Sequence, residues 1–278
     1  MSLKLMYITN NIEVAKIAES VGVDRIFVDM EYIGKSARQG GMDTVQSMHT
    51  LEDVANVRAA LTKSELLVRC NPIHDATDEY CSSEDEINGI IENGADIIML
   101  PYFKTVEEVK RFIKIVGGRA KTMLLFETPE AVENASRILV LKGIDEVYIG
   151  LNDLHLGYGR KFMFELLGDG TVEKLCLKFK YYGHTYGFGG LASLDRGMLP
   201  GKMVLKEHYR LGSSSVILSR SFCNIAKIDD MNEIKQIFVN GVASIRTLED
   251  ECRNQLAYFE DNRARAASII ESIANQDV

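Results

Sequence analysis

The 278-residue sequence contains no tryptophan, only 4 prolines, and 5 cysteines without a Cys-x-x-Cys pair. An odd number of unpaired cysteines argues against a disulfide framework or a structural zinc site, and favours reduced thiols in the cytoplasm. No apolar run approaches the ~18 residues that cross a bilayer, so we expect no membrane anchor. The first residues turn polar too quickly for a secretory signal, which also predicts a cytoplasmic protein.

Positive charge is also scarce. The chain has 32 Lys and Arg against 40 Asp and Glu, a formal net charge of −8. Because an acidic chain without a basic stripe does not attract a phosphate backbone, we expect no nucleic-acid partner. The 46% hydrophobic and 26% charged content excludes disordered, collagen-like and coiled-coil classes. A chain of this length has a large enough core to fold without disulfides.

Eight short apolar runs alternate with stretches of helical periodicity. The runs are continuous, as in strands buried on both faces. They are Leu5–Ile8, Arg25–Met30, Glu65–Cys70, Asp96–Leu100, Thr122–Phe126, Glu146–Ile149, Gly187–Ala192 and Ser215–Ser219. Capping signals at Thr105–Glu108 and Thr128–Pro129 mark helix starts between strands. This alternation predicts an α/β fold, a (β/α)8 TIM barrel over residues 1–228, with a doubly wound open sheet as the alternative.

Residues 229–278 are predicted to form a long C-terminal helical extension, because no Gly or Pro follows Val242. We expect it to pack on a neighbouring subunit and so to make a homo-oligomer. The alternative is two helices folded back on their own barrel.

Three polar segments follow strand ends, on the face where barrel enzymes place their chemistry: Gly34–His49, Pro72–Ser83 and Gly157–Gly170. Two glycine- and serine-rich segments, Gly187–Ser193 and Ser219–Ser221, end the last two strands, where many barrels bind phosphate. No third feature of the sequence supports a phosphate there.

Ionisable residues at the ends of four predicted strands are the candidates for a functional site. Asp29 with Glu31, then Arg69, Glu127 and Asp153 each follow an apolar run, where burial without a partner would be costly. Carboxylates around one arginine indicate a cation site beside an anion-binding group. Two carboxylates would leave positions open for water and substrate oxygens, as a catalytic metal requires. For Asp29 and Glu31, pairing with a Lys or Arg inside the barrel is an equally good interpretation.

Five segments together resemble the HpcH/HpaI aldolase and citrate lyase beta-subunit family. They occur in order within roughly Lys4 to Asn224: Val28–Tyr32, Leu67–Asn71, Glu92–Pro101, Phe126–Val132 and Tyr148–Leu154. Each motif is weak alone, but five in sequence are specific. The resemblance implies a TIM barrel and a divalent-metal-dependent carbon–carbon lyase.

The resemblance also implies roles for individual residues. Glu127 and Asp153 match the two metal ligands, with Mg²⁺ or Mn²⁺ as the ion. Arg69 matches the arginine that contacts the pyruvyl or enolate oxygen. The turn that would hold the substrate carboxylate through its backbone is formed by Gly150, Leu151 and Asn152.

Two positions depart from the aldolase pattern. Glu92 stands where that branch has an aspartate, and Tyr32 stands where it has its histidine. Histidine can both accept and donate a proton near neutral pH, whereas a tyrosine begins near a pKa of ~10. The aldolase mechanism therefore does not transfer intact, and Tyr32, Glu92 and the loop residue His74 are the candidate general bases.

Three functions follow as hypotheses. The first is a metal-dependent aldolase that cleaves a 2-oxo-acid-containing small molecule through a pyruvate enolate. The second is an acyl-CoA lyase of the citrate or malyl type, for which the cations Lys35, Arg38 and Lys104 could contact phosphates. The third is a barrel that binds a metal and a small acid without turnover.

Overall fold

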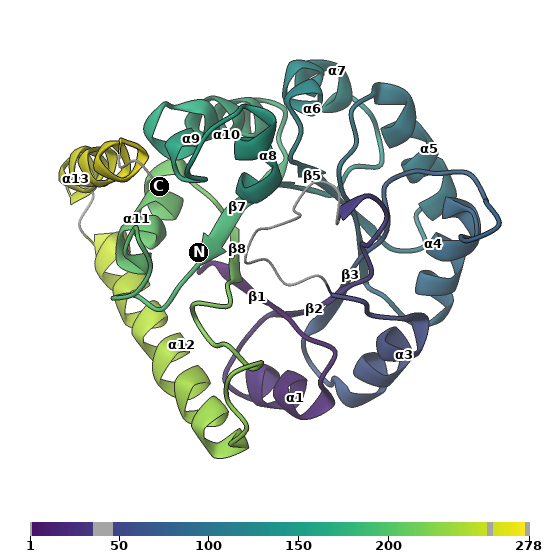
Figure 1. Ribbon diagram of the computed structural model, residues 1–278, viewed down its shortest axis with the longest axis horizontal. Helices are drawn as coiled ribbons and strands as arrows, with labels where there is room; N and C mark the ends of the chain where they lie inside the picture. The colour runs from purple at the N-terminus through teal and green to yellow at the C-terminus, as the bar shows by residue number, and fades with distance from the viewer. Residues whose placement is uncertain (1, 36–46, 255–257, 276–278) are drawn as a thin grey trace.

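Eight parallel strands close into a barrel in the order β1 to β8, with β8 paired to β1 (Figure 1). The computed structural model describes residues 2–35, 47–254 and 258–275. The strands are β1 Lys4–Ile8, β2 Arg25–Asp29, β3 Glu65–Arg69, β4 Ile97–Leu100, β5 Lys121–Phe126, β6 Glu146–Ile149, β7 Thr185–Leu191 and β8 Ser215–Leu218. This closure confirms the predicted TIM barrel and excludes the open sheet.

The barrel is packed on both sides of its sheet, which explains the continuous apolar runs. Side chains such as Met6, Phe27, Leu67 and Met99 fill the interior as one cluster. Their neighbours along each strand face outward into a larger core under the helices. Successive strand residues alternate between these two cores, so the strands have no solvent-facing side.

Helices connect the strands and surround the barrel. They are α1 Ile12–Ser20, α3 Leu51–Ala60, α4 Ser83–Glu92, α5 Val106–Val116, α6 Pro129–Glu133, α7 Ala135–Ile138, α8 Leu151–Gly157, α9 Glu165–Gly168, α10 Thr171–Tyr181 and α11 Gly201–Leu211. The capping box at Thr105 and the N-cap at Thr128 are confirmed. Within the described residues, no helix has the length and apolar content to cross a membrane.

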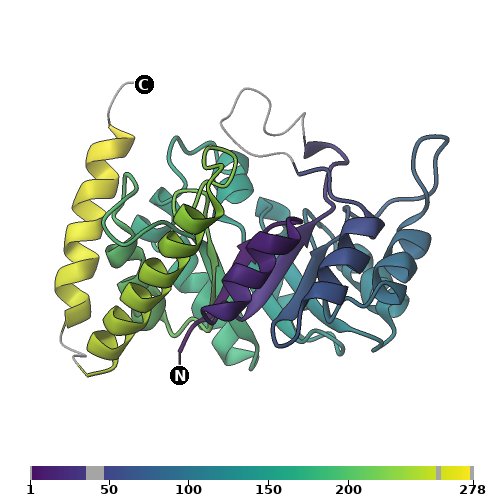
Figure 2. The ribbon, with the colours of Figure 1, turned by 90° about the horizontal axis from the view of Figure 1, so that it is seen from below.

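The tail forms two helices, α12 Met231–Asn254 and α13 Tyr258–Ala274. Helix α12 packs against α1 and α11, and α13 packs against α9 and α11, at the side of the barrel (Figure 2). Phe238 of α12 meets the ring of Tyr7 edge-on, 4.8 Å between centroids. Both helices thus fold back on the barrel, the arrangement that the sequence left as the alternative. A contact with a neighbouring subunit and a domain boundary at residue 229 stay predictions.

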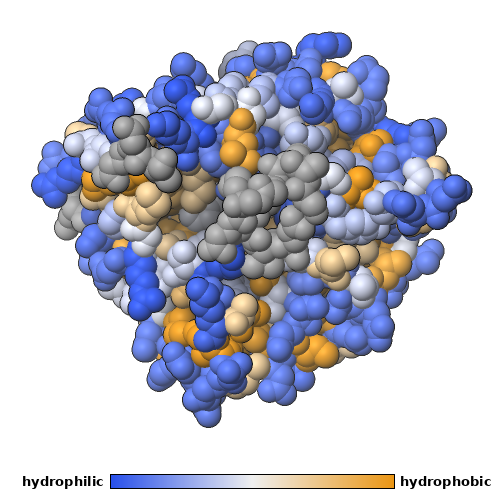
Figure 3. Space-filling model, viewed as in Figure 1, coloured by the Kyte–Doolittle hydropathy of each residue, from blue (hydrophilic) through white to orange (hydrophobic). Residues whose placement is uncertain are grey.

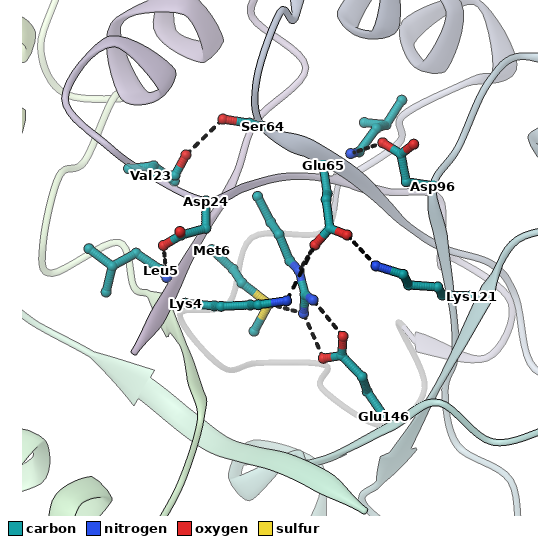
Figure 4. Close-up of polar contacts among 12 residues, drawn as sticks. Lys4, Leu5, Met6, Val23, Asp24, Ser64, Glu65, Asp96, Lys121 and Glu146 are labelled. Atoms are coloured by element: carbon teal, nitrogen blue, oxygen red, sulfur yellow. Dashed lines mark hydrogen bonds and ion pairs between the residues drawn. The ribbon is translucent and has the colours of Figure 1, made fainter. Parts of the chain in front are cut away.

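An ion network occupies the N-terminal end of the barrel (Figure 4). The fully buried guanidinium of Arg25 donates to both oxygens of Glu146, at 2.5 and 2.8 Å, and to Oε2 of Glu65 at 2.9 Å. Lys121 reaches Oε1 of Glu65 at 2.6 Å, and Lys4 lies 3.7 Å from Oε2 on the outer side. Every carboxylate of this network therefore has a cation within contact distance.

Candidate functional site

A cluster of charged side chains lies at the C-terminal end of the barrel. Asp29 ends β2, Arg69 ends β3, and Glu127 follows β5 directly. Asp153 lies in the first turn of α8, just after β6. Together with Glu31, these side chains are largely buried, as expected for ionisable residues that directly follow buried strands.

Asp29 is held by two cations. The Arg69 guanidinium donates to both oxygens of its carboxylate, at 2.7 and 2.8 Å, and the Lys35 ammonium lies 2.9 Å away. Burial alone would raise the pKa of Asp29, but Arg69 and Lys35 outweigh it and hold the pKa well below its usual value. Asp29 is therefore a permanent anion that orients Arg69.

Glu31 belongs to the same ionic group. Its Oε2 lies 3.2 Å from Arg69 Nη1 and 3.5 Å from Lys35 Nζ. The pairing of Asp29 and Glu31 with cations inside the barrel, one of two interpretations of the sequence, is thus observed. Because Asp29 and Glu31 engage three of the guanidinium nitrogens, Arg69 is fixed in orientation at the mouth.

Glu127 has a different environment. Burial, and the nearby charges of Glu31 and Asp153, raise its pKa well above the usual range, while Arg69 and a hydrogen bond from the Tyr102 backbone act in the opposite sense. Like charges in a buried site are stabilised by proton uptake or by a bound cation. The structure thus places Glu127 within the electrostatic influence of both Arg69 and Asp153, while the metal and substrate roles of these residues stay predictions.

Gly150 allows Glu127 to lie where it does. A Cβ at this position would meet Oε2 of Glu127 at 2.7 Å and its Cβ at 2.8 Å. Gly150 also precedes α8, and within the described chain no side chain caps this helix. The first backbone N–H groups of α8, from Leu151 and Asn152, can therefore donate to an anionic group, as the predicted carboxylate-binding turn requires.

Tyr32, the first candidate base, lies at the rim. Its side chain is 39% exposed, and its ring packs against that of Tyr80 with 5.6 Å between centroids. Burial and the neighbouring Glu86, Cys81 and Tyr80 raise its pKa. These neighbours belong to the loop and helix after β3, not to the carboxylate cluster.

The other two candidate bases also lie outside the cluster. Both ring nitrogens of His74 face carbonyl oxygens of its own loop, Pro72 at 2.7 Å and Cys81 at 2.8 Å. Glu92 is the last residue of α4, which leads into the start of β4. That end of the barrel is opposite the one where Glu127 lies, so the fold of a single chain does not bring Glu92 to the cluster.

Two of the three cations that could contact the phosphates of an acyl-CoA substrate lie within the described residues, and both form ion pairs. Lys35 is buried between Asp29 and Glu31, and Lys104 forms an ion pair with Glu130 at 3.0 Å. Arg38 lies outside the described residues, as does most of the predicted loop Gly34–His49.

Sequence reasoning missed a second layer of contacts behind the cluster. Asn71 accepts hydrogen bonds from the backbone of Tyr32 and Ile33 at 2.9 Å, and it donates twice to the buried carboxyl of Glu86. The backbone N–H of Asp29 donates to a ring nitrogen of His49 at 3.0 Å. Glu86 lies in an acidic first turn after the N-cap Ser82, where carboxylates are common, so the sequence carries no signal that distinguishes its role.

No set of three or more His, Cys, Asp or Glu side chains in residues 2–35, 47–254 and 258–275 surrounds a common point as ready metal ligands. Glu127 and Asp153, the pair that the family resemblance assigns to a metal, could supply two carboxylate ligands, and this assignment stays a prediction.

Comparison with known proteins supports a single family. The model of the HpcH/HpaI aldolase/citrate lyase family matches residues 4–163. Among solved structures, an HpcH/HpaI aldolase/citrate lyase family protein from Burkholderia cenocepacia J2315 superposes with a TM-score of 0.63 at 14% identity, covering 84% of this chain and 95% of its own. An HpcH/HpaI aldolase from Desulfitobacterium hafniense DCB-2 gives a TM-score of 0.58 at 16% identity, covering 88% and 93%. No curated protein matches the sequence.

The two structural matches show the fold, and the family model spans the first six strands together with Arg69, Glu127 and Asp153. The family includes lyases of the aldolase and citrate lyase types, as the resemblance of the five segments indicated. This chain belongs to the HpcH/HpaI aldolase/citrate lyase family.

Proposed function

We propose that the protein is a divalent-metal-dependent carbon–carbon lyase that cleaves a 2-oxo-acid-containing small molecule through a pyruvate enolate. The observation that carries this proposal is the convergence of Glu127 and Asp153 beside a fixed Arg69 at the barrel mouth. A lyase needs to hold a carboxylate and to stabilise negative charge on the neighbouring oxygen. The cluster supplies groups for both tasks.

The residues fit a divalent cation. Glu127 is buried near the charges of Glu31 and Asp153, and this environment raises its pKa, so a cation bound there would stabilise the charged carboxylate. Carboxylate oxygens are the ligands that Mg²⁺ and Mn²⁺ prefer. Glu127 and Asp153 would hold the ion, which would act as a Lewis acid on the substrate carbonyl.

Arg69 and the start of α8 would orient the substrate. The N–H groups of Leu151 and Asn152 suit a carboxylate, since no side chain of the described chain caps that helix, while the N–H of Gly150 donates to the backbone oxygen of Phe126 at 3.1 Å. Arg69 is oriented by Asp29 before any substrate arrives, so it stabilises charge on the carbonyl oxygen as the enolate forms. Such preorganised donors contribute most when negative charge develops during the reaction.

The proposed reaction also needs a residue that transfers a proton. With its pKa raised, the Tyr32 phenol is neutral near pH 7, which suits proton donation better than the base role implied by the resemblance. Tyr32, Glu92 and His74 stay candidates, and only Tyr32 directly follows a residue of the cluster, Glu31. Homo-oligomerisation and a cytoplasmic location also stay part of the proposal.

The acyl-CoA alternative would use the same carboxylates with a different substrate. Two of its three candidate phosphate contacts, Lys35 and Lys104, are engaged in ion pairs. The pyruvate-type substrate is therefore the better supported of the two. Comparing the release of pyruvate with the release of acetyl-CoA separates them.

The decisive experiment follows deuterium exchange into the methyl group of pyruvate by NMR, with Mg²⁺ or Mn²⁺ present. We expect Glu127→Gln to slow this exchange at least about 100-fold, because one ligand of the charge-stabilising ion is lost. The matched control is Glu130→Gln, three residues along the chain, which removes a carboxylate whose partner is the half-exposed Lys104. Exchange by Glu127→Gln at the wild-type rate, or a wild-type protein without metal-dependent exchange, contradicts the proposal.

A further inference from the structure

Lys35 is a cation inside the carboxylate cluster, although the sequence suggested it only as a contact for coenzyme A. Hydrophilic residues predominate around the periphery of the molecule in Figure 3, where charged groups keep their water. The side chain of Lys35 is instead only 4% exposed. Burying an ammonium group is costly unless opposite charges lie close to it. The placement of Lys35 therefore depends on the partners that surround it.

Those partners form a closed ring of alternating charges together with Arg69. The ammonium of Lys35 lies 2.9 Å from Asp29 Oδ2 and 3.5 Å from Glu31 Oε2. Arg69 contacts the same two oxygens, with Nη2 at 2.7 Å from Asp29 Oδ2 and Nη1 at 3.2 Å from Glu31 Oε2. Each of the two oxygens thus lies between an ammonium and a guanidinium. Lys35 is the member opposite Arg69, and it closes the ring.

The turn after β2 brings Lys35 back to this ring. The backbone N–H of Lys35 donates to the carbonyl oxygen of Tyr32 at 3.2 Å, and Gly34 between them has a φ of 72°. This left-handed conformation is costly for a residue with a side chain. Asn71, just after β3, anchors the same turn, because its side-chain oxygen accepts the N–H groups of Tyr32 and Ile33 at 2.9 Å. The backbone that leads to Lys35 is therefore held by its own turn and by the end of β3.

The ring limits the movement of the Arg69 guanidinium. Asp29 and Glu31 carry like charges close together, and such charges repel each other in a buried site. Lys35 contacts both and so offsets this repulsion. Without Lys35, we expect Glu31 to move away from Arg69 Nη1. Arg69 would then keep its two hydrogen bonds to Asp29 and lose the contact that fixes its remaining nitrogen.

We propose that Lys35 is a positioning residue of the lyase site, which keeps Asp29 and Glu31 together so that Arg69 meets the developing enolate oxygen in one fixed orientation. This inference rests on the proposed function. A donor that is fixed before the reaction stabilises developing charge without first having to reorganise. Binding of the substrate carboxylate at the start of α8 does not require the ring. The loss of Lys35 should therefore slow the turnover of bound substrate and leave its binding nearly unchanged.

The first test measures metal-dependent deuterium exchange into pyruvate as a function of pyruvate concentration. We expect Lys35→Met to lower kcat at least about 10-fold, a part of the roughly 10²–10³-fold loss that follows removal of a whole charge-stabilising donor, and to change KM by less than about 3-fold. Lys35→Gln, which keeps a hydrogen-bond donor without the charge, should show the same split. Lys180→Met removes an exposed cation of α10 and, as the matched control, should behave like the wild type. Urea unfolding gives the folded fraction to which each rate is referred.

A double-mutant cycle tests whether Lys35 acts through the ring. Glu31→Gln removes the charge that Lys35 holds next to Arg69. Adding Lys35→Met to Glu31→Gln should therefore lower kcat by less than about a further 3-fold, because the two substitutions break the same contact. Effects of the two substitutions that multiply would show that Lys35 acts independently of the ring, and this contradicts the inference.

NMR of the Arg69 guanidinium separates this inference from the proposed function, since it needs neither substrate nor metal. The signals are assigned by their loss in Arg69→Lys. We expect rotation of the guanidinium to be about 10-fold faster in Lys35→Met than in the wild type, because a charge-assisted contact that limits it is lost.

Three results overturn the inference: guanidinium rotation that Lys35→Met leaves unchanged, wild-type kcat and KM in that variant, or a loss of activity confined to KM. A different result bears on the proposed function. If the wild type shows no metal-dependent exchange while Lys35→Met speeds up the rotation, the proposed lyase is contradicted and the role of Lys35 in fixing Arg69 is supported.

Discussion

The two ends of the barrel each bury a group of charged side chains, and the groups differ in their balance. At the N-terminal end, Arg25, Lys4 and Lys121 contact the carboxylates of Glu65 and Glu146. At the C-terminal end, Asp29 and Glu31 contact the cations Arg69 and Lys35, whereas Glu127 lies buried near the charges of Glu31 and Asp153. The first group pairs its carboxylates with cations, whereas the second contains a buried carboxylate that a bound cation would stabilise.

The pKa values of one carboxyl group from each end, Glu65 and Glu127, are shifted in opposite directions. Burial works to raise the pKa of Glu65, but hydrogen bonds from Lys121 and Arg25 outweigh it and lower the pKa to about 2. For Glu127, burial and two neighbouring carboxylates act together and raise the pKa. Ion pairs that lower the pKa of a carboxylate stabilise the fold near neutral pH, whereas a buried carboxylate with a raised pKa is typical of functional sites.

The largest stability effect is expected at the closed end. Arg25→Met should lower the free energy of unfolding by about 3–5 kcal/mol, because it leaves Glu146 buried without its partner. Urea unfolding measures this. The double variant with Glu146→Met should recover most of the loss, and pyruvate exchange per folded molecule should stay at the wild-type level in both. A loss of exchange in the folded variants would show that the two ends are not separate in role.

A smaller effect is expected at the open end, with a distinctive pH dependence. The folded state holds the Glu127 proton to higher pH than the unfolded chain, whose carboxyl titrates near 4.5. Without metal, the stability that this group contributes is therefore present below pH 4.5 and is lost as the pH rises toward the folded-state pKa. The loss amounts to about 1.4 kcal/mol for each pH unit that separates the folded and unfolded pKa values.

Glu127→Gln should remove this loss, so the metal-free variant should be more stable than the wild type at pH 7. Added Mg²⁺ or Mn²⁺ should stabilise the wild type by about 2.7 kcal/mol at 100 times its dissociation constant, and leave the variant unchanged. Thermal unfolding across pH 4–8, with and without metal, measures both. Equal metal stabilisation of the two proteins would remove Glu127 from the metal site.

The smallest effect is expected at the outer edge of the closed end. Lys121 is half exposed, and its ion pair with Glu65 is accessible to water. Lys121→Met should therefore change the free energy of unfolding by less than about 1 kcal/mol. It should also shift acid unfolding to higher pH, because Glu65 loses one of the hydrogen bonds that lower its pKa from 4.5 to about 2. Acid titration followed by circular dichroism detects the shift.

The strands were predictable from the sequence because burial on both faces leaves a continuous apolar run. Each predicted run differs from the observed strand by no more than two residues at either end. The Gly187 run begins two residues late, since Thr185 and Tyr186 extend β7 through pairing with β6 rather than through their own pattern. The C-terminal tail was harder. A helical pattern does not state what covers its apolar face, and α12 and α13 cover theirs with α1, α9 and α11.

Position at the ends of strands was sufficient to predict that Arg69, Glu127 and Asp153 lie at the same end of the barrel, because the fold brings the C-terminal ends of all strands together. The same reasoning did not predict the environment of His74, whose ring nitrogens contact backbone oxygens of its own loop. Lys35 was missed as part of the cluster because the chain must turn back after β2 before its ammonium meets Asp29. Such returns depend on three-dimensional packing and leave no periodic signal in the sequence.

One backbone feature next to Glu127 distinguishes the two oxygens of its carboxylate. Tyr102 adopts a φ of 46°, a left-handed conformation that costs a side-chain-bearing residue about 1–2 kcal/mol, and its N–H donates to Oε1 at 2.9 Å. Oε2 faces the space left by the missing side chain of Gly150. The carboxylate is therefore asymmetric: Oε1 is anchored to the backbone of Tyr102, and Oε2 is the oxygen that the proposed metal would contact.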